Sequence, residues 1–174
     1  APVGMRYHAG FADPAVAGYF ADSFPDAVFK WSFPSDAVST TTPPPARVLY
    51  HAGFADPAVA GYFARGRGFY DTSIPYYRDR YAATADVYKW AFPSDAVSTA
   101  TSAPTTMGNN AGFADPAVAG YFSRGDNSGT VYKWAFPSDA VSVTTSAPVG
   151  MRYHAGFADP AVAGYFSSGE PIYK

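Results

Sequence analysis

Apolar and polar positions along this chain follow two short patterns that recur over its whole length. The first, which we call module A, reads Ala-Gly-Phe-Ala-Asp-Pro-Ala-Val-Ala-Gly-Tyr-Phe and occurs without substitution at 9–20, 52–63, 111–122 and 155–166. Its apolar residues are small or aromatic, and an Asp-Pro pair interrupts them. Asp is preferred at a helix N-cap and Pro at the first helical position. Each Asp-Pro pair is therefore predicted to start a helix.

The helix predicted for module A is short, because a glycine lies four residues after each proline, at a position where glycine commonly ends a helix. Isolated helices need roughly 12–15 residues to be stable in water. Each module is expected to form a short helical turn that carries Phe on one side and Tyr-Phe on the other and needs another surface. The predicted helix caps are Asp13, Asp56, Asp115 and Asp159.

The second pattern, module B, combines aromatic residues with a β-branched tail. It reads Phe-Lys-Trp-Ser-Phe-Pro-Ser-Asp-Ala-Val-Ser-Thr at 29–40, and closely related sequences occupy 88–99 and 132–142. The Ser-Asp pair indicates another capped turn. The tail favours a short extended run.

The two modules divide the chain into repeats. The expected divisions are repeat 1 at 1–46, repeat 2 at 47–104 with an insertion at 65–84, repeat 3 at 105–146, and a partial repeat 4 with module A only at 147–174. Insertions into repeat arrays normally lie on one exposed face. Residues 1–8 recur at 147–154, so the 174 residues are expected to be a window on a longer array or a piece of a polyprotein.

Composition argues against an ordinary globular core. Leucine occurs once and isoleucine twice, whereas the chain has 14 Phe, 14 Tyr, 3 Trp, 16 Gly and 16 Pro. Scattered aromatic residues do not offset the roughly 1–2 kcal/mol of backbone entropy that each ordered residue loses. We therefore expect a mostly irregular, extended repeat chain with short helical turns, few short strands and no compact globular core.

Charge and residue chemistry disfavour several classes of function. A formal net charge of −2 gives no electrostatic reason to bind nucleic acid, and no run approaches the about 18 apolar residues of a membrane span. The chain has no cysteine, and one histidine per repeat (His8, His51 and His154, with Asn110 in repeat 3) supplies too few ligands for zinc. No Ser-His-Asp set or phosphate loop is present. We expect no metal, no cofactor and no enzymatic activity.

The candidate binding residues are the aromatic side chains and lysines of the two modules. Trp and Tyr dominate binding hot spots, and a flanking Lys adds a charge for an acidic partner. The alternatives are that each Trp packs on the Phe-Pro of its own module and that the exact copies reflect duplication alone. The candidate partner-binding residues are Phe11, Tyr19, Phe20, Lys30, Trp31, Phe54, Tyr62, Phe63, Lys89, Trp90, Phe113, Tyr121, Phe122, Lys133, Trp134, Phe157, Tyr165 and Phe166.

Part of module A resembles a known antenna loop. The Gly-Phe-Ala-Asp-Pro segment at 10–14, with its copies at 53–57, 112–116 and 156–160, is similar to the Gly-Phe-x-Asp-Pro sequence in the N-terminal loop of red-lineage chlorophyll a/c (fucoxanthin-type) light-harvesting proteins. That family continues with Leu-Gly-Leu, whereas this chain continues with Ala-Val-Ala-Gly-Tyr. The membrane helices and chlorophyll ligands of the family are absent. The resemblance implies that module A docks where such loops dock, and it implies no pigment binding.

Two functions are compatible with these features. The first is a non-enzymatic multivalent linker or scaffold whose repeats bind successive equivalent sites on a large multi-subunit assembly. The resemblance implies a photosystem–antenna supercomplex as one host, and hence a thylakoid-associated location in a plastid. The alternative is an extracellular structural protein that forms a fibre, sheath or wall by self-packing of repeats and is open to O-glycosylation. The expected partners are other protein subunits or identical chains, and the surroundings of Trp31, Trp90 and Trp134 distinguish the two.

Overall fold

The computed structural model describes residues 8–23, 26–49, 51–57, 59–69, 81–116, 118–151, 155–159, 162–167 and 172–173. Within these ranges the chain forms strands, turns and irregular connections, without a helix. The strands are β1 (Ala9–Asp13), β2 (Ala17–Ser23), β3 (Asp26–Ser32), β4 (Val38–Thr41), β5 (Ala52–Asp56), β6 (Ala60–Ala64), β7 (Arg67–Phe69), β8 (Tyr81–Ala83), β9 (Val87–Ala91), β10 (Ala96–Thr99), β11 (Gly112–Asp115), β12 (Ala119–Gly125), β13 (Ser128–Ala135), β14 (Ala140–Val143), β15 (Ala155–Asp159), β16 (Ala163–Ser167) and β17 (Ile172–Tyr173).

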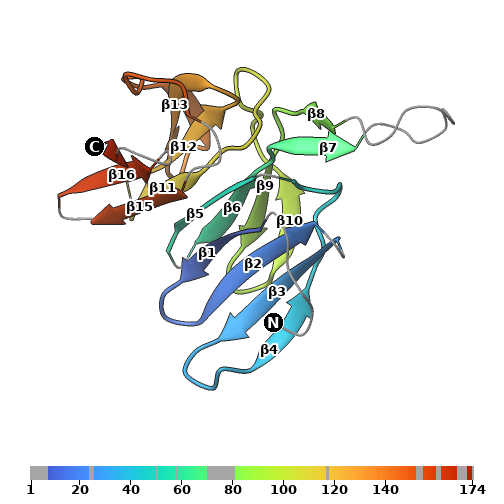
Figure 1. Cartoon of the computed structure of the whole chain (residues 1–174). Helices are drawn as coiled ribbons and strands as arrows, with labels where there is room; N and C mark the ends of the chain where they lie inside the picture. Colours follow the sequence, from blue (N-terminus) through green and yellow to red (C-terminus); the bar gives the residue numbers. More distant parts are fainter. Residues whose placement is uncertain are drawn as a thin grey trace, which may run out of the picture.

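Each repeat forms its own antiparallel sheet. The strand orders are β1-β2-β3-β4, β5-β6-β9-β10, β11-β12-β13-β14 and β15-β16-β17. In repeat 2, β7 and β8 pair as a separate two-stranded ribbon that points away from the sheets in Figure 1. The ribbon lies within the segment expected as an insertion, 65–84, of which residues 70–80 lie outside the described part of the chain.

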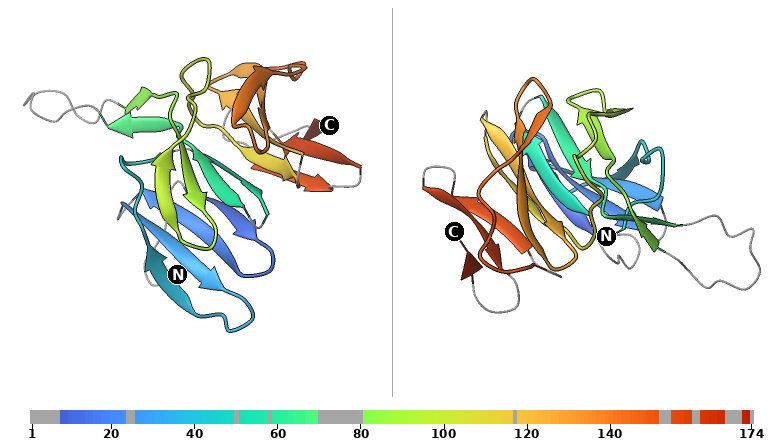
Figure 2. Two further views of the ribbon diagram at one scale, coloured as in Figure 1. Left: turned by 180° about the vertical axis from the view of Figure 1, so that it is seen from behind. Right: turned by 90° about the horizontal axis from the view of Figure 1, so that it is seen from above.

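The sheets lie one on another in the order of the sequence, from blue to red in Figures 1 and 2. Their first strands, β1, β5, β11 and β15, pack against one another at successive interfaces. Glycine allows these backbones to approach closely. A Cβ atom on Gly53 would overlap the carbonyl oxygen of Gly10, one on Gly112 would lie 3.1 Å from the carbonyl oxygen of Gly53, and one on Gly156 would lie 2.7 Å from that of Gly112.

Module A is a β-hairpin, so the helix predicted for it is wrong. In repeat 1, β1 and β2 pair with Asp13 opposite Ala17. The N–H of Val16 donates to the carbonyl oxygen of Asp13 at 3.0 Å, and the N–H of Ala15 donates to Asp13 Oδ1 at 3.2 Å. These contacts make a four-residue turn with Asp first and Pro second, and β-turns favour these two residues at those positions.

The predicted helix caps therefore have a different role. Asp13, Asp56, Asp115 and Asp159 each accept, at the carbonyl oxygen, a hydrogen bond from the valine three residues later. Each aspartate begins a hairpin turn and none caps a helix. The hairpin is preferred because side chains alternate along its strands. Both faces of module A can then pack on neighbouring repeats, which a short isolated helix cannot achieve.

The chain has a compact core, contrary to the expected irregular and extended chain. The largest fully buried side chains include Trp90, Trp134, Tyr19, Tyr62 and Phe63. Alanine and valine lie between the rings in these clusters, so the core is closely packed with little help from leucine or isoleucine. The aromatic residues that looked scattered along the sequence are gathered by the stacking of sheets.

Module B forms the second hairpin of each complete repeat. Its β-branched tails are the strands β4, β10 and β14, as predicted. The connecting turns contain a cis Phe-Pro bond, and they hold Asp36, Asp95 and Asp139 at positive φ values of 54°, 56° and 54°. Asp is one of the few residues other than glycine that adopts this conformation readily.

Candidate functional site: the interfaces between repeats

Each sheet has two faces with different side chains. In repeat 2, Phe54, Tyr62 and Lys89 lie side by side on β5, β6 and β9 and face repeat 3. We call this the downstream face. Gly61 and Trp90 lie side by side on β6 and β9 and contact Phe11 of repeat 1. We call this the upstream face. Because the modules recur, the other sheets have corresponding faces.

A phenylalanine on each downstream face occupies the space beside a glycine of the next upstream face. The three pairs are Phe11 with Gly61, Phe54 with Gly120, and Phe113 with Gly164. In each pair a Cβ atom on the glycine would overlap the ring. The ring of Phe54 also stacks on Tyr62 of its own sheet, at 5.1 Å between centroids, and on Phe122 of the next repeat at 5.5 Å. The interface is thus aromatic and closely packed.

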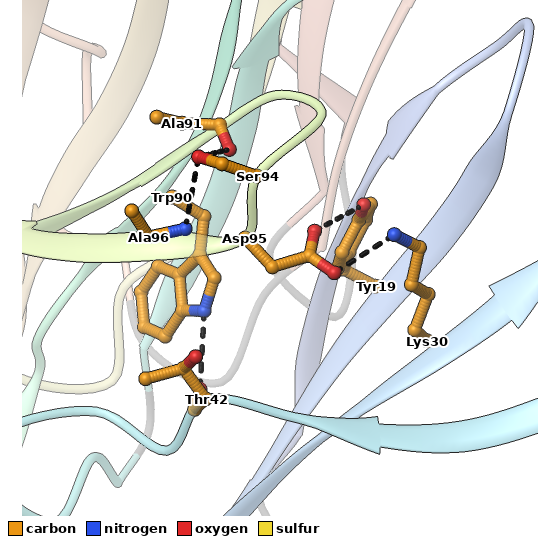
Figure 3. Close-up of polar contacts among 8 residues, drawn as sticks. All are labelled: Tyr19, Lys30, Thr42, Trp90, Ala91, Ser94, Asp95 and Ala96. Atoms are coloured by element: carbon orange, nitrogen blue, oxygen red, sulfur yellow. Dashed lines mark hydrogen bonds and ion pairs between the residues drawn. The ribbon is translucent and has the colours of Figure 1, made fainter.

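In repeats 1 and 2, an aspartate from the next repeat joins the tyrosine and lysine of the downstream face. Figure 3 shows Asp95 of repeat 2, whose Oδ1 accepts a hydrogen bond from the Tyr19 hydroxyl at 2.8 Å and whose Oδ2 accepts one from Lys30 Nζ at 2.8 Å. The side chains of Lys30 and Asp95 are only 19% and 20% exposed. We call this set the Tyr–Lys–Asp clamp. Residues far apart in the sequence thus hold repeats 1 and 2 together.

The same clamp recurs between repeats 2 and 3. Asp139 accepts hydrogen bonds from the Tyr62 hydroxyl at 2.8 Å and from Lys89 Nζ at 2.7 Å. At a third position Lys133 Nζ lies 5.9 Å from the centre of the Tyr121 ring, so the tyrosine and lysine are again adjacent. The 174 residues contain three module B aspartates, and two of them close a clamp.

The turn that carries each clamp aspartate is held by a serine. Ser94 Oγ donates to the carbonyl oxygen of Ala91 at 3.3 Å and accepts from the N–H of Ala96 at 3.3 Å (Figure 3). The N–H of Asp95 donates to the carbonyl oxygen of Ala91 at 2.9 Å. Ser138 makes the corresponding two contacts, each at 3.4 Å. The hydrogen bonds within its own turn therefore position the carboxylate, independently of the neighbouring repeat.

Burial and hydrogen bonding set the ionisation of the clamp. Burial raises the pKa of Tyr62, and the hydrogen bond to Asp139 adds to the rise. Burial also raises the pKa of Tyr19. For Asp139 burial alone would raise the pKa, but hydrogen bonds from Lys89, Tyr62 and Trp134 outweigh it and lower the pKa. At neutral pH Asp139 is therefore a carboxylate, and Tyr19 and Tyr62 are un-ionised phenols that can donate to their aspartates.

The three tryptophans have different surroundings. Trp90 and Trp134 are fully buried, whereas Trp31 is partly exposed. The indole N–H of Trp90 donates to the carbonyl oxygen of Thr42 in repeat 1 at 3.2 Å (Figure 3). The indole N–H of Trp134 donates to Asp139 Oδ1 of its own turn at 3.1 Å. Two of the three tryptophans are enclosed by repeats of this chain.

Most residues predicted to bind a partner lie at these interfaces. The buried ones are Phe11, Tyr19, Phe54, Tyr62, Phe63, Trp90, Phe122, Trp134 and Phe166. The partly exposed ones are Phe20, Lys30, Trp31, Lys89, Phe113, Tyr121, Lys133 and Tyr165. Phe157 is exposed. These buried residues lie at three interfaces. Phe11, Tyr19, Phe63 and Trp90 pack between repeats 1 and 2, Phe54, Tyr62, Phe122 and Trp134 pack between repeats 2 and 3, and Phe166 packs on Phe113 between repeats 3 and 4.

Sequence reasoning missed the module B aspartates as contact residues, because a Ser-Asp pair after Phe-Pro was interpreted as a cap. One signal could have identified them. The Tyr and Lys of repeat 1 are followed one repeat later by Asp95, and those of repeat 2 are followed one repeat later by Asp139. A carboxylate repeated in step with a cation is the pattern expected of an ion pair between repeats.

His51 is a second residue whose role only the structure reveals. Its Nε2 accepts a hydrogen bond from the N–H of Ala9 in repeat 1 at 3.2 Å. Burial lowers its pKa to about 3, so the ring is neutral. In repeat 3 the corresponding Asn110 donates to the carbonyl oxygen of Ala64 in repeat 2 at 3.0 Å. Both residues connect their own repeat to the preceding one.

The comparisons add no relative of known function. No protein-family model matches the chain, and no curated protein matches its sequence. Within the described ranges, no group of three or more His, Cys, Asp or Glu residues could hold a metal ion. In the same ranges no helix is long and apolar enough to cross a membrane. The interfaces between repeats are therefore interpreted from their own geometry.

Proposed function

We propose that this chain is a non-enzymatic structural protein whose repeats pack on one another, sheet on sheet, as a rigid building element. The observation that carries the proposal is the recurrence of the Tyr–Lys–Asp clamp between repeats 1 and 2 and between repeats 2 and 3. A repeat array whose neighbours share one kind of interface grows by adding interfaces of that kind. Of the two functions expected from the sequence, this is the self-packing one.

Two further features support a structural role. Most of the aromatic side chains that a linker would present to partners are instead buried between the repeats of this chain, as Trp90 and Trp134 are. A chain that binds several separate sites at once needs joints between its binding modules that can span the distance between those sites. Here close aromatic packing and a charged clamp fix each repeat on the next, which suits a load-bearing or spacing element.

The serine and threonine residues of the edge strands support an extracellular location for this structural protein. The tails of module B carry exposed hydroxyl groups at Ser39, Thr40, Ser98, Thr99 and Ser142. They lie on β4, β10 and β14, at the outer edge of three sheets. Hydroxyl-rich segments near proline are open to O-glycosylation in secreted proteins.

Photo-crosslinking in the organism that makes the protein tests the proposed function. A photoreactive residue is placed at Val59 or Val118, which are 46% and 50% exposed in hairpin turns. Crosslinks to identical chains or to glycans are the expected result. Crosslinks mainly to other proteins would contradict the structural role and favour a linker. The matched control places the same residue at the fully buried Val87, where only contacts within the chain are expected.

A second candidate function is a multivalent scaffold, and one observation favours it. The hairpin turns expose a valine at the same position in all four repeats: Val16, Val59, Val118 and Val162. Four equivalent apolar sites are what multivalent binding to successive subunits requires. Replacing all four valines with serine leaves the interfaces between repeats intact. Under this candidate the variant loses retention on isolated photosystem–antenna complexes, the host implied by the light-harvesting resemblance. Equal retention of variant and parent chain would rule it out.

A further inference from the structure

We propose that copies of this chain associate head to tail, with the downstream face of repeat 4 in one copy packed on the upstream face of repeat 1 in a second copy. These faces belong to the two outer sheets of the stack (Figures 1 and 2). The inference rests on the structural function proposed above and extends it from neighbouring repeats to neighbouring chains.

The upstream face of repeat 1 is an apolar groove. Its volume is about 740 Å³, and its lining includes Gly18, Phe20, Trp31, Phe33 and Val38. Phe33 is 44% exposed and Trp31 is partly exposed. The corresponding residue of Trp31 in the next repeat, Trp90, is fully buried because repeat 1 covers it. The groove is therefore an interface surface of the same kind without its covering sheet.

Gly18 marks the position that a phenylalanine occupies at the other interfaces. It corresponds to Gly61 and Gly120, where a Cβ atom would overlap the ring from the preceding repeat. Among the described residues, a Cβ atom on Gly18 would instead meet side chains of its own repeat, Phe20 at 3.6 Å and Phe33 at 3.7 Å. The space for a ring is present beside Gly18, and within the described part of the chain no ring fills it.

Phe157 of repeat 4 is the corresponding ring without a glycine to cover it. It is 50% exposed, whereas Phe54 is 2% exposed. Phe157 stacks on Tyr165 with ring centroids 5.0 Å apart and an interplanar angle of 15°. Phe54 stacks on Tyr62 in the same way, at 5.1 Å and 8°. Because the ring already has the geometry of the internal interfaces, association requires little reorganisation.

Asp36 supplies the polar part of the same interface. Its φ of 54° matches the 56° and 54° of the two clamp aspartates, Asp95 and Asp139. The indole N–H of Trp31 donates to Asp36 Oδ1 at 3.1 Å, as Trp134 does to Asp139. Asp36 is exposed. Its carboxylate is placed to accept a hydrogen bond from the Tyr165 hydroxyl of a second copy.

The two surfaces differ, so the contact between copies is heterologous. One copy presents a groove with an aspartate, and the other presents a Phe-Tyr pair. Each association leaves one free groove and one free Phe-Tyr pair at the ends of the assembly. Heterologous contacts that do not close into a ring extend into filaments. Association of this chain is therefore expected to continue beyond the dimer as protein concentration rises.

Sedimentation of the purified 174-residue chain over a range of concentrations tests the proposal. The parent chain is expected to form dimers and longer species. Phe157→Ser removes the ring, and Gly18→Ala places a methyl group where the ring would lie. Each variant is expected to weaken association by at least about tenfold, with unfolding curves close to those of the parent chain. The matched control Val143→Ser changes a 59% exposed valine on β14, outside both surfaces, and is expected to associate like the parent.

Mixing the two blocked variants identifies the pair of surfaces directly. Phe157→Ser retains the groove and Gly18→Ala retains the Phe-Tyr pair, so an equimolar mixture is expected to form dimers that grow no further. Asp36→Asn is expected to weaken association of the full chain without changing its unfolding curve. A mixture that stays monomeric, or variants that associate as the parent does, would overturn the proposal.

A parent chain that remains monomeric at every concentration would also overturn it. That result would still be compatible with a structural function in which chains pack side by side. The photo-crosslinking experiment tests that function separately. Crosslinks mainly to other proteins would instead contradict the structural function, whatever the purified chain does in the centrifuge.

Discussion

The ring of Phe54 in repeat 2 lies where Gly120 in repeat 3 lacks a side chain. Both residues belong to module A, one in its first strand and the other in its second. Every copy of the module therefore carries a ring for one neighbour and a vacant position for the other. Close packing of a large residue against a small one fixes the distance between sheets and the offset of one on the next.

The first prediction concerns this contact. Gly61→Ala places a methyl group in the ring of Phe11, and overpacking of this kind costs about 1–3 kcal/mol. Gly18→Ala is the matched control, because its methyl group would lie at ordinary contact distance from Phe20 and Phe33. We expect Gly61→Ala to lower the free energy of unfolding by that amount and Gly18→Ala to change it by less than about 0.5 kcal/mol. Urea unfolding at low protein concentration measures both. Equal effects of the two substitutions would argue against the ring-on-glycine contact.

The second prediction concerns the clamp. Asp139→Asn keeps a residue that tolerates positive φ but removes the charge that Tyr62 and Lys89 contact. Hydrogen bonds to charged groups contribute about 1.5–3 kcal/mol, so we expect the free energy of unfolding to fall by about 2 kcal/mol. Asp36→Asn is the control, because Asp36 is exposed and bonds only locally to Trp31 among the contacts described. It is expected to cost less than about 0.5 kcal/mol in the monomer. If both variants unfold alike, the clamp contributes nothing to stability.

The third prediction concerns pH. Burial lowers the pKa of His51 to about 3, with a smaller repulsion from His8, while the unfolded chain titrates near 6.5. Between these values the unfolded chain binds a proton that the folded chain excludes. The free energy of unfolding therefore falls as the pH falls below 6.5, by up to about 1.4 kcal/mol per pH unit from this group.

The control for this pH dependence is His51→Asn, which introduces the residue found at the corresponding position in repeat 3, Asn110. Carboxylates also lose stability in acid, so the informative quantity is the difference between parent and variant from pH 7 to pH 4.5. We expect the parent to lose stability more steeply than the variant over this window. Parallel curves would show that His51 is protonated in the folded chain or does not contribute.

The fourth prediction concerns tryptophan fluorescence. Trp90 and Trp134 are fully buried and Trp31 is partly exposed, so Trp31 is expected to account for most quenching by acrylamide. Trp31→Phe should therefore remove most of the concentration-dependent quenching in the monomer. The comparison is with the parent chain at the same low concentration. Unchanged quenching in the variant would place a buried tryptophan in contact with solvent.

Local sequence was sufficient for part of this architecture. The β-branched tails of module B predicted the strands β4, β10 and β14. The same modules supplied the aromatic residues and lysines that form the interfaces. These features depend on residue identity and on neighbours close in the chain, which the sequence records directly.

The choice between helix and hairpin for module A needed contacts from outside the module. Asp13 followed by Pro14 suits the start of a helix and the first two positions of a β-turn equally well. The hairpin prevails because β2 pairs with β3 and because Phe11 packs on Gly61 of the next repeat. Neither partner belongs to the same copy of the module, so no local pattern distinguishes the two structures.

The clamp depended on tertiary structure for the same reason. Tyr19 and Asp95 are separated by 76 positions, and their contact exists only because one sheet lies on the next. The core also depended on tertiary structure, because rings that are far apart in the sequence become buried only when their sheets stack. Side-chain alternation gives each strand two usable faces, and burial of both requires two neighbouring sheets that only the folded stack provides.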